Sequence, residues 1–258
     1  MKNKRELNIS NGFNFRDVGG YMDKRGARIK WHKLVRVAYL SDLSAQDQQL
    51  LFDYGIRTVI DLRSDAEIIR YPDWYLRGTN YLRVPVLNEN LTNSMTKIAD
   101  LSQNAKSEYG IKQMLEVYNL LVTQEQAQQA YRDIFTILAE SNGGVSIHCA
   151  TGKDRTGVAV ILLLKVLGIP NSVIKDDYLM TNRFSALHIN NRLNEAKCDG
   201  ANGKMLKTIF NLSTVNAQYY DKITSTIGNE FGDFSNYIYS QLEVTHSIVK
   251  KLRKKFMN

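Results

Sequence analysis

Val145-Ser-Ile-His-Cys-Ala-Thr-Gly-Lys-Asp-Arg-Thr-Gly157 is the most informative segment of this chain. Its β-branched beginning predicts a short buried strand that ends at His148. The apolar run from Val158 to Leu167 predicts a long buried helix. The intervening turn therefore lies between a strand and a helix, which is where α/β proteins bind phosphate groups.

The composition of this turn fits an anion-binding loop. Gly152 lets the backbone curl so that successive N–H groups point inward. The helix that begins near Thr156 adds free N–H groups and the positive end of its dipole. We expect the substrate phosphate to be bound by Ala150, Thr151, Gly152 and Lys153.

Two side chains of the segment carry reactive chemistry. Cys149 lies at the base of the loop, where the positive field favours the nucleophilic thiolate. Arg155, six positions later, offers a planar two-pronged donor for phosphoryl oxygens. Together, these two residues predict phosphoryl transfer through a cysteinyl-phosphate intermediate. A lone cysteine is often only a small buried hydrophobe, but that reading does not explain the residues around it.

The motif His148-Cys149-x5-Arg155-Thr156-Gly157 resembles the signature of the protein tyrosine phosphatase superfamily. Its fuller form is similar to atypical bacterial tyrosine phosphatases, some of which are secreted and also accept phosphoinositides. The resemblance implies that Cys149 attacks phosphorus while Arg155 and the loop N–H groups stabilise the equatorial oxygens. We expect His148 to orient the loop and Thr156 to donate its hydroxyl to the sulfur. Neither a metal nor another cofactor is expected.

A second motif, Asn14-Phe-Arg-Asp-Val-Gly-Gly20, is similar to the N-terminal motif of the same phosphatases. The glycine pair marks a place where the backbone turns or closely approaches another group. We interpret it as a structural turn in which Arg16 and Asp17 pair with neighbouring backbone. Direct contact with substrate is the alternative.

A third motif, Asp61-Leu-Arg-Ser-Asp-Ala-Glu67, follows the predicted strand Thr58–Leu62. Ligands of open α/β sheets bind at the carboxyl ends of the strands, so Asp61 and Arg63 are candidates for the pocket wall. Ser64 and Glu67 have the spacing of a capping box, and we therefore interpret Glu67 as a helix cap rather than a catalyst.

The general acid is open between two carboxylates. Tyrosine phosphatases usually carry this Asp on a mobile loop before the cysteine, but the chain has no Trp-Pro-Asp and residues 113–140 look helical. Asp154 is the preferred general acid because it lies in the loop just before the arginine. An Asp at this place is similar to that of myotubularin lipid phosphatases. Asp61 is the second candidate. Asp154 would otherwise pin the loop by accepting N–H bonds. Asp176 and Asp177 are adjacent on a helix, point apart and suggest a surface and packing role.

We predict an α/β fold of the cysteine-phosphatase type, with a central, mostly parallel sheet flanked by helices and extra helices in the middle and C-terminal parts. Residues 1–258 are expected to form a single phosphatase domain, large enough to bury its own core. Residues 1–11 look flexible, and residues 92–140 read as a helical insertion or lid. Helix Ala45–Tyr54 and strand Tyr81–Pro85 are further expectations.

Composition limits the environment and the partners. The two cysteines, Cys149 and Cys198, do not suggest a disulfide framework. We expect a cytoplasmic enzyme, with secretion open if a signal peptide was removed. A net charge of +8 fits an anionic substrate, and no nucleic-acid motif is present. Phosphotyrosine proteins are the expected partners. The basic cluster Lys250–Lys255 is either a solvated helix end or a membrane-docking patch.

Lys153 bears on the substrate. A lysine at this position is similar to that of phosphoinositide 3-phosphatases, where it meets extra phosphate charge, so phosphoinositides at a membrane surface are a second candidate substrate. It would otherwise be a basic residue on the rim. A serine/threonine or lipid phosphatase, a sulfurtransferase and an inactive phosphate-binding module are the competing readings. An inactive module generally lacks the cysteine or the arginine, and this chain has both.

Overall fold

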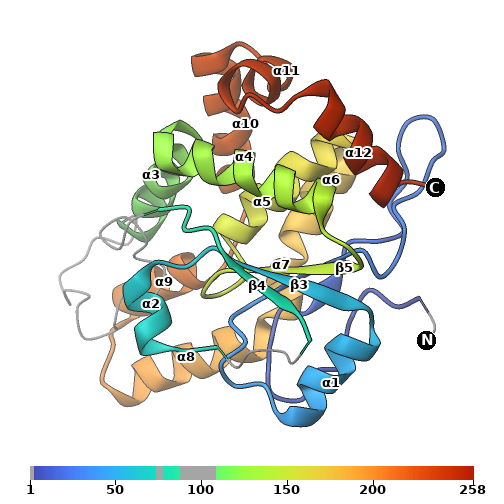
Figure 1. Cartoon of the computed structure of the whole chain (residues 1–258). Helices are drawn as coiled ribbons and strands as arrows, with labels where there is room; N and C mark the ends of the chain where they lie inside the picture. Colours follow the sequence, from blue (N-terminus) through green and yellow to red (C-terminus); the bar gives the residue numbers. More distant parts are fainter. Residues whose placement is uncertain (1–2, 74–77, 88–108) are drawn as a thin grey trace.

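The structure is a computed structural model that describes residues 3–73, 78–87 and 109–258 (Figure 1). Within these residues the chain forms a central sheet with helices packed around it. The predicted α/β class is therefore confirmed. The part of the expected lid at residues 92–108 lies outside the described residues.

The sheet has five strands in the order β1-β2-β5-β3-β4. The pairings β2–β5, β5–β3 and β3–β4 are parallel, and only β1 runs antiparallel to its neighbour. The strand that leads into the phosphate loop is thus the central one. The strands are β1 Arg16–Asp17, β2 Leu34–Val37, β3 Ile56–Asp61, β4 Asn80–Arg83 and β5 Gly144–His148.

Helices cover the sheet, and Figure 1 shows α4, α5 and the C-terminal helices gathered on one side of it with α1 on the other. The extra helices expected in the middle and C-terminal parts are present. They are α1 Ala45–Asp53, α2 Asp65–Arg70, α3 Tyr109–Thr123, α4 Glu125–Glu140, α5 Arg155–Val166, α6 Asn171–Leu179, α7 Thr181–Phe184, α8 Ala186–Cys198, α9 Gly203–Ser213, α10 Ala217–Phe231, α11 Phe234–Asn236, the π-helical turn η4 Tyr237–Gln241 and α12 His246–Phe256.

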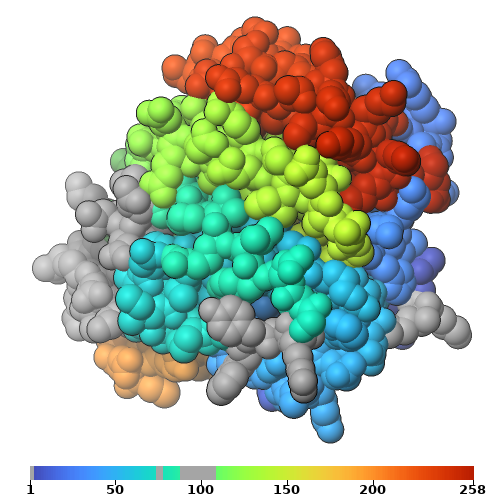
Figure 2. Space-filling model, viewed as in Figure 1, coloured from blue at the N-terminus to red at the C-terminus, as the bar shows by residue number. Residues whose placement is uncertain are grey.

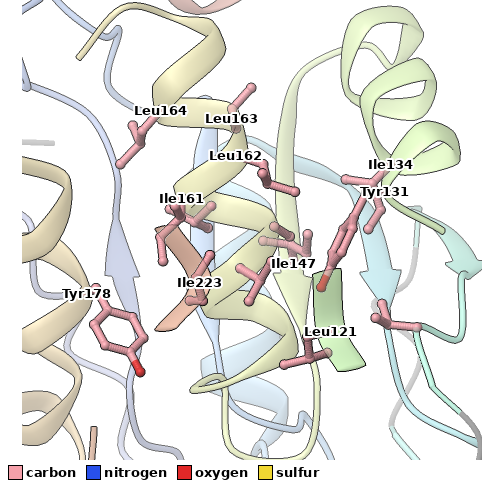
Figure 3. Close-up of a cluster of buried hydrophobic side chains, with 14 of the residues drawn as sticks. Leu121, Tyr131, Ile134, Ile147, Ile161, Leu162, Leu163, Leu164, Tyr178 and Ile223 are labelled. Carbon is pink, nitrogen blue, oxygen red and sulfur yellow. The ribbon is translucent and has the colours of Figure 1, made fainter. Parts of the chain in front are cut away.

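The core is built around helix α5. Its residues from Arg155 to Leu164 are all buried, as expected for a helix that is apolar on every side. Figure 3 shows Ile161 to Leu164 packed among Ile147 of β5, Tyr131 of α4 and Ile223 of α10. Because both the strand before the phosphate loop and the helix after it are fixed in this core, the loop is held at both ends.

Local sequence signals explain several element boundaries. Ser44 caps α1 in a complete capping box with Asp47, so the predicted helix Ala45–Tyr54 is confirmed. The strand expected over Tyr81–Pro85 is found as Asn80–Arg83, and α3 and α4 confirm the helices expected before residue 140. No helix of the described segments is long and apolar enough to cross a bilayer.

The N-terminal segment departs from expectation. Glu6 forms an isolated antiparallel bridge with Arg16, and Leu7 is buried. The Arg5 side chain donates to the carbonyls of Asp17 and Gly19 at 2.8 and 2.9 Å. Residues 5–7 are therefore part of the fold rather than a free extension. Their apolar and cationic contacts are with residues distant in sequence, which a local reading does not reveal.

Candidate active site

The phosphate loop connects β5 to α5 and spans Cys149 to Asp154. Its curvature depends on Gly152, which has a φ of +65°. A Cβ atom at this position would lie 2.2 Å from the carbonyl oxygen of Val37, so a larger residue does not fit. Ala150 is fixed from the outside, because its carbonyl accepts the backbone N–H of Tyr39 at 3.3 Å.

Cys149 and Arg155 lie at the two ends of the loop, and both are buried. The Cys149 thiol is free. The Arg155 guanidinium is held in a two-pronged ion pair by Glu67, whose oxygens accept from Nη1 and Nη2 at 2.7 and 2.6 Å. Burial alone would raise the pKa of Glu67, but the hydrogen bonds and charge of Arg155 lower it.

Glu67 therefore has two roles. The interpretation as a cap is correct, because Ser64 and Glu67 form a complete capping box at the start of α2. The sequence alone does not reveal the second role, in which the same carboxylate orients Arg155 from 88 positions away. One available signal is the position of Glu67 just after the end of a parallel strand. Another is the resemblance of Asp61-Leu-Arg-Ser-Asp-Ala-Glu67 to a motif of the same phosphatases.

His148 lies behind the loop in a buried charged cluster. Its Nε2 atom is 3.2 Å from Asp73 and 3.8 Å from Asp61, and its Nδ1 atom is 3.3 Å from the carbonyl oxygen of Cys149. Arg63 bridges the two carboxylates at 2.8 Å from Asp61 and 2.6 Å from Asp73. This arrangement fits an orienting role for His148. Nothing in the sequence pointed to Asp73 as a member of the cluster.

The cluster counts against two sequence-based assignments. Asp61 is fully buried and ion-paired, and although burial would raise its pKa, His148 and Arg63 hold the pKa well below the ordinary value. An acid that stays ionised is a poor proton donor. The Arg63 guanidinium is 1% exposed and is already engaged by two carboxylates, so it does not line the pocket. Both residues support the loop from behind.

The same cluster brings Asp61, Asp73 and His148 close enough together to be considered as metal ligands. The Arg63 guanidinium lies between the two carboxylates and already supplies the compensating positive charge. A metal ion would have to displace it. The donor set therefore fits a salt-bridged support for His148 better than a metal centre.

Asp154 is bound by a tyrosine pair that the sequence did not suggest. The Tyr118 hydroxyl donates to Asp154 Oδ1 at 2.5 Å and accepts from the Tyr178 hydroxyl at 2.6 Å. Burial and the negative charge of Asp154 raise the pKa of Tyr118 well above its ordinary value. Asp154 makes no side-chain capping bond to α5, but its Oδ1 atom lies 3.5 Å from the ammonium of Lys153, the preceding residue of the loop.

Lys153 is buried beside the loop. It is 2% exposed, and its ammonium donates to the carbonyl of Leu212 at 2.5 Å and to that of Thr214 at 3.4 Å. Burial is the main reason that the pKa of this lysine is lowered. The expected contact of Lys153 with substrate phosphate stays a prediction. In this structure Lys153 ties the loop to the end of α9.

Two loop hydroxyls are buried without a hydrogen-bond partner among the described residues: those of Thr151 and Thr156. The expected bond from Thr156 to the sulfur of Cys149 is therefore not formed here.

The N-terminal motif supports the loop through buried charges. Arg16 and Arg36 flank Asp177, with Arg16 Nε 3.5 Å and Arg36 Nη1 2.8 Å from its carboxylate oxygens. Arg36 also donates to the Gly152 carbonyl at 3.0 Å, and Asn14 donates to two loop carbonyls at the same distance. The structural interpretation of the motif fits this geometry, and none of these contacts reaches the inner face of the loop.

The surface role expected for Asp177 is wrong. Asp177 is 1% exposed, and although burial would raise its pKa, Arg16 and Arg36 lower it. Asp176, its neighbour, is exposed as expected. The partners of Asp177 are 141 and 161 positions away in the sequence, which is why a helical pattern alone could not identify them.

Comparisons with known proteins agree with this geometry. A family model described as the tyrosine phosphatase family matches residues 7–258. The chain is 28% identical over 247 residues to a protein of Cupriavidus necator provisionally named a tyrosine-protein phosphatase, covering 95% of this chain and 86% of that protein. It is 30% identical over 196 residues to the triple specificity protein phosphatase PtpB of Mycobacterium tuberculosis, covering 67% and 68% of the two chains. A tyrosine-protein phosphatase of Nostoc commune is 29% identical over 165 residues, which are 62% of this chain and 52% of that protein.

Proposed function

The chain belongs to the tyrosine phosphatase family and is a phosphatase, and we propose that it hydrolyses phosphotyrosine in proteins through a cysteinyl-phosphate intermediate. The observation that carries the mechanism is the pairing of Cys149 with Arg155 across one glycine-turned loop, with Glu67 fixing the guanidinium at 2.6 and 2.7 Å. Such a site holds positive charge where charge develops on the phosphoryl oxygens.

The reaction proceeds in two displacements. The Cys149 thiolate attacks phosphorus in line with the departing phenolic oxygen, so that an S–P bond forms as the P–O bond breaks. Arg155 and the loop N–H groups bind the three equatorial oxygens. Water then attacks the phosphoryl group, which releases inorganic phosphate and regenerates the thiolate. His148 and Glu67 act as positioning residues in both steps.

Asp154 is the proposed general acid. Tyr118 donates to its Oδ1 atom at 2.5 Å and the Lys153 ammonium lies 3.5 Å from the same atom, whereas Oδ2 has no hydrogen bond from the described residues. Asp61 lies behind the loop in an ion pair and is kept ionised. Phenolate leaves with a pKa of about 10 and needs less protonation than an alkoxide, so loss of the acid should affect lipid or serine substrates more than aryl phosphates.

Phosphotyrosine is the preferred substrate class. The buried ammonium of Lys153 is bound to two carbonyl oxygens and lies 3.5 Å from the Asp154 carboxylate, which already compensates its charge. The name of the Mycobacterium tuberculosis relative gives it triple specificity, which supports testing a wider range here. We expect phosphoinositide turnover to be weak unless Lys153 moves, and phosphotyrosine proteins are the proposed partners.

The test compares turnover of a phosphotyrosine peptide, p-nitrophenyl phosphate and a mono-phosphorylated inositol lipid by the wild type and three variants. Cys149→Ser should abolish turnover without unfolding the protein. Asp154→Asn should lower turnover most at acidic and neutral pH and should remove the decline in activity at high pH, whereas Asp61→Asn should mainly reduce stability. If the wild type binds the phosphopeptide but shows no turnover at any pH, the protein is a phosphate-binding module instead. Full activity of Cys149→Ser would exclude the cysteinyl-phosphate mechanism.

A further inference from the structure

The positive charge of this chain is concentrated in two short segments. Residues 21–33 contain five Lys or Arg and one Asp, and residues 246–258 contain five Lys or Arg and no acid. Together these 26 residues carry a charge of +9, whereas the whole chain carries +8. The other 232 residues therefore sum to −1. The basic character of the protein is a local property.

The two segments pack against each other and form one surface, which we call the basic face. Backbone hydrogen bonds join Lys30 to Phe256 at 2.7 Å and Asn258 to Arg28 at 3.0 Å. The Lys30 ammonium also donates to the Lys254 carbonyl at 3.0 Å. Figure 2 shows the C-terminal helices in red and the N-terminal segment in blue adjoining at the upper right of the molecule. The cations of the basic face are Lys24, Arg25, Arg28, Lys30, Lys33, Lys250, Lys251, Arg253, Lys254 and Lys255.

Few acidic groups neutralise this face. Arg253 is paired with Asp23 at 2.9 Å, and Lys251 with Glu140 at 3.3 Å. No carboxylate of the described residues lies within ion-pair distance of four exposed side chains, those of Lys24, Arg25, Lys250 and Lys254. Burial and the charge of Lys33 lower the pKa of Lys255 to about 8, so the cations are close enough to repel one another.

The basic face is distant from the phosphate loop. Arg253 donates to the carbonyl of Leu167, at the end of α5 away from the loop, and Lys255 donates to that of Ser141, just before β5. The twelve residues of α5 span about 18 Å. The face therefore lies at the opposite edge of the sheet from Cys149 and cannot be part of the substrate pocket.

We propose that the basic face docks the protein on the surface of an anionic lipid bilayer. Seven of its ten cations are lysines, which act as compact point charges suited to a diffuse layer of headgroups. Met22 begins the same turn and is 45% exposed, so an apolar side chain stands beside Lys24 and Arg25. An exposed apolar side chain beside lysines fits insertion among lipid headgroups. The exposed forked donors Arg25 and Arg28 make duplex DNA the competing ligand, and the test below includes it.

Docking in this way orients the enzyme. Because the basic face and the phosphate loop lie at opposite edges of the sheet, the loop opens away from the bilayer. The docked enzyme then reaches phosphorylated proteins near the membrane rather than headgroups of the bilayer that holds it. The proposal concerns binding and is independent of the catalytic mechanism.

The experiment measures sedimentation with vesicles of phosphatidylglycerol and phosphatidylcholine, and with vesicles of phosphatidylcholine alone. The test variant carries Lys24→Glu, Lys250→Glu and Lys254→Glu. The matched control carries Lys197→Glu, Lys204→Glu and Lys207→Glu, three exposed lysines of α8 and α9. Both variants have the same net charge, and p-nitrophenyl phosphate turnover checks that each is folded.

The wild type and the control should bind only the vesicles with phosphatidylglycerol, and binding should weaken as salt is added. The test variant should bind at least about a hundredfold more weakly, because each basic residue near such a surface contributes measurably to adsorption. An equal loss in both variants, or no vesicle binding by the wild type, would overturn the proposal. Binding of duplex DNA without binding of vesicles would also overturn it.

Discussion

Asp177→Asn is the substitution that most directly tests how the fold supports the phosphate loop. Asp177 is the carboxylate between Arg16 and Arg36, and both guanidinium groups are fully buried. Removal of one partner from a buried ion pair typically costs about 3–5 kcal/mol, because the remaining charge is left uncompensated in a poorly solvated place. We expect a loss of this size in the free energy of unfolding.

Asp176→Asn is the matched control, because it is the same change at the adjacent, exposed position. Its effect should stay within about 0.5 kcal/mol. Urea denaturation followed by circular dichroism measures both. With a urea dependence of about 3 kcal/mol per molar, the midpoint of Asp177→Asn should fall by more than about 1 M. Equal midpoints for the two variants would refute the buried-cluster explanation.

The effect of Asp177→Asn should also depend on pH. Arg16 and Arg36 lower the pKa of Asp177 in the folded state below its unfolded value of about 4. The stability that this carboxylate contributes is therefore fully present above about pH 4 and is lost as the pH falls through the folded pKa. The difference between wild type and variant should shrink on acidification below about pH 4. A difference that grows in acid would contradict the assignment.

Three further predictions concern the loop. Glu67→Gln keeps the cap of α2 but loses the charged pair with Arg155. The kcat for p-nitrophenyl phosphate should therefore fall about tenfold to a hundredfold, while the melting temperature should change little. Gly152→Ala should lower the free energy of unfolding far more than Gly26→Ala. Both glycines have a positive φ, but a Cβ atom would contact other atoms only at position 152. Equal losses in urea denaturation would count against this contact. Tyr118→Phe removes a buried hydrogen bond to a carboxylate and should cost about 2 kcal/mol of unfolding free energy, while an unchanged urea midpoint would show that the bond is not formed.

The parts of the fold that the sequence predicted well are those set by local chemistry. The capping boxes at Ser44 and Ser64 fix where two helices begin, and the apolar run after Gly157 identifies a buried helix. The loop itself could be predicted because Cys149, Gly152 and Arg155 are close together in the sequence and their functions depend on that spacing.

The parts that could not be predicted depend on contacts between distant residues. Glu67 reaches Arg155 across 88 positions, and Tyr118 reaches Asp154 across 36. The sequence predicts that Lys153 binds substrate phosphate, but it gives no sign that the ammonium donates to the carbonyl of Leu212, 59 positions away. These pairings are decided by how the strands and helices pack, and hydrophobic periodicity carries no information about them.

The most direct test of the account is to identify the phosphorylated residue during turnover. Wild-type protein mixed with a phosphotyrosine peptide should be quenched in acid within milliseconds to seconds and analysed by peptide mass spectrometry. We predict one phosphate on Cys149, and none on that peptide in Cys149→Ser. A phosphate on His148, or steady turnover with no covalent phosphoprotein at any quench time, would contradict the cysteinyl-phosphate mechanism.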